Sequence, residues 1–202
     1  GQAGLTGWWR MRILGIDPGI RNTGWGVVTL DGTRLVHLAN GVIQPDPKAA
    51  DAARLSTIAQ GLSQVIETHR PDAAAIEEIF VARSASSALK LGMARGVAMM
   101  QCAHAGLDVA EIAARQVKKS VVGTGRADKA QVTAMVTRLL SVKAVNADAA
   151  DALAIAIAAG HDGMAGFGET SGAADATAGG SGLEKAIAAA LARDAGNGRG
   201  EG

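Results

Sequence analysis

Two acidic residues follow short apolar runs, where their carboxylates could act together on a metal ion. Asp17 ends the run at 12–16 and is followed by a proline and a glycine, while Glu77 ends the run at 73–76. Such runs predict buried strands, and neighbouring strands that each end in an acid bring their carboxylates together. Side chains alternate along a strand, so Glu77 and Glu78 face opposite sides. We assign Glu77 to the site.

Asp148 and Asp151 add two more acids, three residues apart on one face of a predicted helix. Each acid has a simpler explanation: Asp17 could cap a turn, and acids in a first helical turn complement the helix dipole. The set of four is more informative than any member. Carboxylates without cysteine favour Mg²⁺ or Mn²⁺, and two ions roughly 3.5–4 Å apart could drive hydrolysis of a phosphodiester. We therefore predict catalytic metal ligands at Asp17, Glu77, Asp148 and Asp151.

A basic stretch lies between these acidic segments and suggests contact with phosphate. Residues 111–138 hold six basic side chains against the two acids Glu111 and Asp128; the six are Arg115, Lys118, Lys119, Arg126, Lys129 and Arg138. A solvated helical face is the alternative explanation. The position of the stretch favours binding of the nucleic-acid backbone, and we expect Arg115, Lys118, Lys119 and Lys129 to contribute.

Phe80 lies three residues beyond Glu77 and precedes a polar loop that contains Arg83. This position suggests a residue that stacks on or wedges between bases, with Arg83 beside it on the DNA, and core packing is the alternative. His104 and His161 are distant from the acids in sequence and are interpreted as structural. His161 is in addition a weak candidate for a residue that assists the site, because it lies near the helix that carries Asp151.

Composition limits the class of protein. The 202 residues are 48% hydrophobic, enough for one domain, and the net charge of +1 is too small to indicate nucleic acid by itself. Cys102 is the only cysteine, which excludes an intramolecular disulfide and suits a reducing compartment. No stretch approaches the roughly 18 apolar residues of a membrane span, and no signal-peptide core is present. We expect a cytoplasmic protein.

The order of predicted elements indicates an α/β fold with a mixed five-stranded sheet flanked by helices. Strands are expected at 12–16, 24–30, 34–42, 73–76 and 107–112, with a hairpin turn at Asp31 and Gly32. Helices are expected at 50–70, 84–105, 129–140 and 147–159. We expect residues 11–162 to form the domain. Residues 1–10 are interpreted as an extension and 163–202 as a disordered Gly/Ala-rich tail.

Five motifs in this order resemble the RuvC family, the bacterial Holliday-junction resolvases. They are Gly15–Gly19, Ile76–Phe80, Ser87–Gly92 with Ala94–Gly96, Ala114–Lys118 and Asp148–Leu153. The resemblance spans Met11 to about Ala159 and implies an RNase H-like fold. It also implies a magnesium-dependent homodimer that makes paired, symmetric nicks in four-way junction DNA and cooperates with the RuvA–RuvB branch-migration complex.

The same resemblance carries the family's site residues onto this sequence. It places the catalytic acids at Asp17, Glu77, Asp148 and Asp151, the base-contacting aromatic at Phe80, and the basic DNA-binding positions at Lys118 and Lys129.

Three other functions share some of these features. An RNase H-like nuclease that cuts RNA/DNA hybrids would use the same acids. ATPases of the actin and Hsp70 class also place an acid after their first strand, but they need a second lobe and a further phosphate-binding loop. A DNA-binding module without activity would leave four acids that repel phosphate and serve no purpose.

Overall fold

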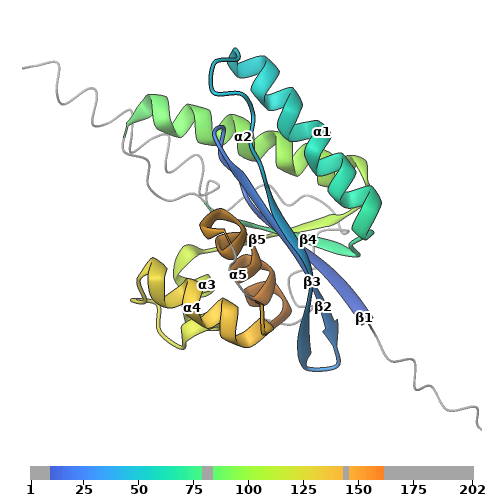
Figure 1. Ribbon diagram of the computed structural model, residues 1–202, viewed down its shortest axis with the longest axis vertical. Coiled ribbons are helices and arrows are strands. Elements are labelled where there is room, and N and C mark those ends of the chain that lie inside the picture. Colours follow the sequence, from blue (N-terminus) through green and yellow to red (C-terminus); the bar gives the residue numbers. More distant parts are fainter. Residues whose placement is uncertain (1–9, 79–83, 143–145, 162–202) are drawn as a thin grey trace, which may run out of the picture.

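A computed structural model of the chain describes residues 10–78, 84–142 and 146–161. Three strands begin the chain, helices and strands alternate in its middle, and three helices follow the last strand (Figure 1). The elements are β1 (Arg10–Asp17), β2 (Thr23–Asp31), β3 (Arg34–Ile43), α1 (Asp51–His69), β4 (Ala73–Glu77), α2 (Ala85–His104), β5 (Asp108–Ile112), α3 (Ala114–Val122), α4 (Lys129–Leu140) and α5 (Ala147–His161).

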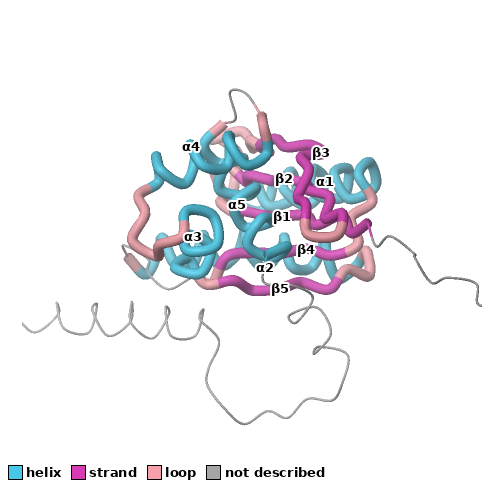
Figure 2. The backbone as a smooth tube through the Cα atoms, turned by 90° about the horizontal axis from the view of Figure 1, so that it is seen from below, coloured by secondary structure: helices cyan, strands magenta, loops and turns pink. Residues whose placement is uncertain are grey.

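The five strands form one mixed sheet in the order β3-β2-β1-β4-β5, which Figure 2 shows from the side. β1, β2 and β3 pair antiparallel, whereas β4 runs parallel to both β1 and β5. The β2–β3 hairpin turns at Gly32, whose φ of 63° lies in the left-handed region that glycine adopts readily. The predicted sheet and the predicted hairpin are both confirmed.

Helices cover both faces of the sheet, so its central strands are apolar on both sides (Figure 1). Leu14 and Ile16 of β1 pack with residues of α1 and α2. Ile13, which points the other way, packs with residues of α3, α4 and α5. Because side chains alternate along a strand, Asp17 lies on the same side as Ile13, toward α5.

α5 is the central helix of the second face, and its residues from Ala149 to Gly160, apart from Asp151, are buried. It packs directly against β1 and β2 because two glycines leave room for its backbone. A Cβ at Gly15 would collide with the carbonyl oxygen of Ala152, and a Cβ at Gly24 with that of Asp148. These close approaches hold the amino-terminal turns of α5 beside the end of β1.

The sequence analysis missed one helix and misplaced one boundary. α3 was read only as part of a basic stretch, yet Val117 and Val121 recur at helical spacing and Gly123 ends the helix in a left-handed conformation. β1 begins at Arg10, one residue before the expected start of the domain, and the Arg10 guanidinium pairs with Asp31. The expectations for residues 1–9 and 163–202 lie outside the described residues.

The structure also shows the environment of the single cysteine and bears on membrane spans. Cys102 is fully buried in the core between the sheet and α2, and burial raises the pKa of its thiol to about 11. Among the described residues, no helix combines the length and the apolar character that crossing a bilayer requires.

Candidate active site

Asp17 and Glu77 lie side by side because they end adjacent parallel strands. Ile16 of β1 is in register with Ile76 of β4, so the next residue of each strand is an acid at the same edge of the sheet. Both side chains are partly buried. The juxtaposition predicted from the two apolar runs is therefore present.

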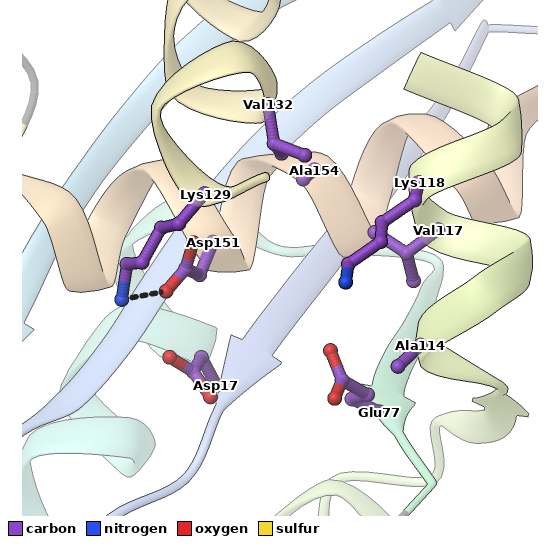
Figure 3. A pocket seen from close by; sticks show the side chains of 9 residues that line it. All are labelled: Asp17, Glu77, Ala114, Val117, Lys118, Lys129, Val132, Asp151 and Ala154. Atoms are coloured by element: carbon purple, nitrogen blue, oxygen red, sulfur yellow. Dashed lines mark ion pairs between the residues drawn. The ribbon is translucent and has the colours of Figure 1, made fainter. Parts of the chain in front are cut away.

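Asp151 reaches these two acids from the first turns of α5. Its carboxylate, about a quarter exposed, faces the ends of β1 and β4 in Figure 3. Asp148 lies one helical turn earlier, where its backbone N–H donates to the side-chain oxygen of Asn146 at 2.9 Å. Asp148 does not line the pocket that holds the other three acids but an adjoining hollow.

The pocket has a volume of about 420 Å³ and joins acidic, basic and apolar side chains (Figure 3). Lys118 of α3 and Lys129 of α4 enter it from the helices above the three acids. Its remaining lining is small or branched and apolar: Ala114, Val117, Val132 and Ala154. The apolar lining lowers the local dielectric, so charges at this site interact more strongly than they would in water.

The negative charges of this pocket are incompletely compensated. The pKa of Asp17 is raised to about 7, first by burial and then by the charges of Asp151 and Glu77. The pKa of Glu77 is also raised, again by burial first and by Asp151 second, while Lys118 opposes that rise. Carboxylates that raise one another's pKa in a cleft mark a site that favours a bound cation.

The comparison with known proteins identifies the family. The model of the family described as crossover junction endodeoxyribonuclease RuvC matches residues 13–159. The chain belongs to the RuvC family. RuvC of Caulobacter vibrioides is 56% identical over 147 residues, which cover 72% of this chain and 87% of that protein.

Two solved structures extend the comparison. Thermus thermophilus RuvC in complex with a Holliday junction substrate superposes with a TM-score of 0.69 at 34% identity, over 73% of this chain and 92% of that one. The yeast mitochondrial Holliday junction resolvase matches with a TM-score of 0.51 at 15% identity, over 73% and 78% of the two chains, and this likeness concerns the fold alone. The predicted RNase H-like fold of RuvC is thus confirmed.

RuvC nucleases depend on divalent metal, and the donor set of this pocket fits such an ion. As the side chains stand, no three His, Cys, Asp or Glu residues within the described ranges are arranged to hold a metal. The donors are nevertheless all carboxylate oxygens, which Mg²⁺ and Mn²⁺ prefer, and the pKa values of Asp17 and Glu77 are raised by burial and then by the negative charge of neighbouring carboxylates. Lys129 now takes up part of that charge, because its ammonium group binds Asp151.

The predicted DNA-binding residues divide into three groups. Lys118 and Lys129 lie inside the pocket, beside the acids. Arg115 and Lys119 are exposed and line a different hollow with Gly123 and Gly125. Phe80 and Arg83 fall outside the described residues. The basic stretch is therefore not one surface, because α3 turns Lys118 toward the acids and turns Arg115 and Lys119 toward a different hollow.

The two histidines do not line the acidic pocket. Nδ1 of His161 lies 3.2 Å from the carbonyl oxygen of Ser120 and so joins the end of α5 to α3. His104 ends α2, far along the chain from the acids. The structural interpretation of His161 agrees with this contact.

Sequence reasoning missed a residue that supports Glu77 from behind. The buried guanidinium of Arg95 on α2 donates from Nε to the carbonyl oxygen of Glu77 at 3.4 Å. It also forms an ion pair with Glu111 of β5 and donates to the sulfur of Met99 at 3.2 Å. A lone arginine among small and apolar residues of a helix was the available signal, since a charge is buried only when it is paired.

Proposed function

We propose that this protein resolves four-way DNA junctions by metal-dependent hydrolysis of phosphodiester bonds, with Asp17, Glu77, Asp148 and Asp151 as its catalytic acids. The observation that carries the proposal is the meeting of three of these acids with two lysines in one pocket of a RuvC-family chain. Asp148 stands close enough to raise the pKa of Asp17, which supports its inclusion.

In this pocket the carboxylates would bind the metal ions and the lysines would bind the phosphate. The carboxylates of Asp17, Glu77 and Asp151 would hold divalent cations, Mg²⁺ or in its place Mn²⁺, at the ends of β1, β4 and α5. Two such ions, when bound, would supply activation of the attacking water and neutralisation of the leaving oxygen. Lys118 and Lys129 would hold the oxygens of the phosphate, since their ammonium groups point into the same space.

Lys129 has a second role in this mechanism. Its ammonium group now lies against Asp151, where it compensates charge before substrate arrives. A cation on Asp151 would free this ammonium group for phosphate. The lysine would thus pass from a carboxylate to the substrate within one pocket.

Paired nicks require two active sites, and we propose a homodimer. The outer face of α2 exposes Leu89 and Met100, with 65% and 46% of their surface accessible. Two large apolar side chains on one exposed helix suit a contact with a second copy of this chain. Light scattering should then give twice the mass of the chain, and Leu89→Lys should lower that mass.

The cellular setting is also part of the proposal. We propose that the protein acts in the cytoplasm on junctions handled by a RuvA–RuvB branch-migration complex. Phe80, Arg83, Arg115 and Lys119 stay predicted DNA contacts. Arg115 and Lys119 have the exposure that a phosphate contact requires.

Cleavage of a synthetic four-way junction tests the proposal. Linear duplex and RNA/DNA hybrid of the same sequence would be run beside it, with and without Mg²⁺. Paired, metal-dependent nicks confined to the junction are expected. Cutting of the hybrid alone would keep the acids but assign the protein to another substrate.

The variant Asp148→Asn tests the acid that lies outside the pocket. It removes a ligand charge without removing volume, so cutting should fall by at least about 10²-fold while junction binding persists. Asp108→Asn is the matched control, because Asp108 is exposed at the opposite end of the sheet. Full activity of Asp148→Asn would remove Asp148 from the site.

A further inference from the structure

The turn between β1 and β2 carries an exposed arginine next to the acids. It spans residues 18–22, directly after Asp17, and Arg21 lies near its end. Two hollows meet at this turn, and Arg21 and Asn22 line both of them. The larger, of about 610 Å³, also includes Asp148, Ser87 and Lys90.

The turn is held in place from two sides. The buried Thr23 hydroxyl donates to the carbonyl oxygen of Gly19 at 2.9 Å. Nη2 of Arg54, from α1, donates to the carbonyl oxygen of Ile20 at 2.8 Å. The residue before Arg21 is therefore fixed to a helix on the other face of the sheet.

The support that Arg54 gives to the turn requires the burial of a poorly paired charge. Only 9% of its side chain is exposed, the nearest carboxylate oxygen, on Asp51, lies 3.7 Å away, and its Nε has no partner in the part of the chain that the structure describes. Burial of a charge is unfavourable unless the charge is well paired. What Arg54 achieves with its one short hydrogen bond is the position of the turn, and hence of Arg21.

The charge around this turn favours an anion. Arg21 has no ion pair within the described residues. Lys90 is 47% exposed and lies 3.9 Å from Asp51, a loose pair that leaves much of its charge available. Asp148 is the one acid among the residues that line the larger hollow.

The order of the strands places this turn and Lys118 on opposite sides of Asp17. β2 lies on one side of β1, and β4, which ends in Glu77, lies on the other. Lys118 acts on Glu77, on the β4 side. A nucleic-acid strand that runs from Glu77 across the acids toward β2 therefore meets Lys118 first and Arg21 after passing Asp17.

We propose that Arg21 binds a backbone phosphate of the strand being cut, on the β2 side of the acids, and so fixes that strand across the active site. The inference rests on the proposed function, because it requires a DNA strand in the pocket. Four carboxylates repel the phosphates that flank the cut. Lys118 offsets this repulsion beside Glu77, and Lys129 offsets it beside Asp151. Arg21 supplies an exposed cation beyond Asp17, on the turn that leads to β2.

Salt dependence of binding tests the contact. Full-length protein would be titrated with four-way junction in EDTA over a range of salt concentrations. Arg21→Gln should weaken binding about tenfold and reduce the slope of log Kd against log salt by about 0.9, the value for one phosphate. Arg21→Lys should keep most of the slope. Arg34→Gln, which removes an exposed charge at the start of β3, should leave it unchanged.

Replacement of single phosphates by uncharged linkages shows which phosphate Arg21 contacts. Methylphosphonate linkages would be placed one at a time on each side of the cleavage site. One position on a single side should weaken binding by the parent about tenfold and have no effect on Arg21→Gln. Equal slopes for Arg21→Gln and Arg34→Gln, or equal linkage effects in parent and Arg21→Gln, would overturn the assignment. If the parent protein still makes paired nicks in junctions, these results overturn the Arg21 contact and leave the proposed function intact. If the parent protein binds no junction, both the Arg21 contact and the proposed function are overturned.

Discussion

The ammonium nitrogen of Lys129 lies 2.6 Å from Oδ2 of Asp151, across the mouth of the acidic pocket (Figure 3). The position of the lysine is fixed by the start of α4, where Asp128 and Gln131 form a reciprocal capping box. The hydrogen bond to Asp151 raises the pKa of Lys129, so the ammonium group keeps its charge. The ammonium group of Lys129 thus compensates the negative charge of Asp151, which a bound metal ion would otherwise compensate.

Substitution of Lys129→Gln should lower cleavage far more than it lowers binding. The glutamine cannot stabilise charge that develops on the phosphate, and loss of one such group typically costs about 10²-fold in rate. Single-turnover cleavage of a junction at saturating protein measures the step. Arg34→Gln is the control, because Arg34 is exposed at the start of β3 and is not among the predicted DNA contacts. Equal losses in the two variants would contradict a special role for Lys129.

Stability of the metal-free protein should fall as pH rises. The pKa of Asp17 is about 7 in the folded protein against 3.8 for the ordinary group, so the folded state binds the proton more tightly. Below pH 4 both states are protonated and there is no effect. Between about pH 4 and pH 7 the unfolded chain ionises first, and above pH 7 the full penalty, of the order of 2–4 kcal/mol, applies.

Urea unfolding in EDTA at about pH 5 and about pH 8 measures this penalty. The parent should be less stable at the higher pH, and Mg²⁺ should restore more stability there than at pH 5. Asp17→Asn should lose most of the difference, since it carries no titrating group. A parent equally stable at both pH values would show that Asp17 ionises normally.

The sequence was most informative where neighbours in the chain decide the structure. Apolar runs that end in Asp17 and Glu77 predict strands and acids without any knowledge of pairing. Asp148 and Asp151 share a face through helical geometry alone. The fold class and the meeting of the acids could therefore be predicted from local pattern together with the resemblance to RuvC.

Contacts between distant segments could not be predicted in this way. Nothing local to Arg95 reveals that its guanidinium reaches Glu77 and Glu111 from another element. The basic stretch divides into two surfaces because residues of α3 form a helix. That helix is short and mostly polar on its outer side, and the sequence analysis missed it. Gly15 and Gly24 read as ordinary strand residues until α5 is seen to approach them.

Substitution of Gly24→Ala should separate α5 from the sheet. The new methyl group would meet the carbonyl oxygen of Asp148, a backbone atom that cannot rotate away. We expect a loss of about 1–3 kcal/mol in the free energy of unfolding, as for overpacking elsewhere, and reduced cleavage because Asp148 must shift. Urea unfolding and junction cleavage measure the two effects. Unchanged cleavage in a destabilised variant would show that Asp148 tolerates the displacement.

The ion pair behind Glu77 gives the last prediction. Glu111→Gln should destabilise the protein by about 2–3 kcal/mol although Glu111 is 39% exposed, because Arg95, with 6% of its side chain exposed, is left without its carboxylate. Addition of Arg95→Met should recover part of that loss, since the buried charge is then gone.

Unfolding of both single variants and of the double variant in urea completes the cycle. Cleavage by the double variant should stay low even where stability returns, because the carbonyl group of Glu77 has lost its donor. If the double variant regained full cleavage, the contact of Arg95 with Glu77 would serve stability alone.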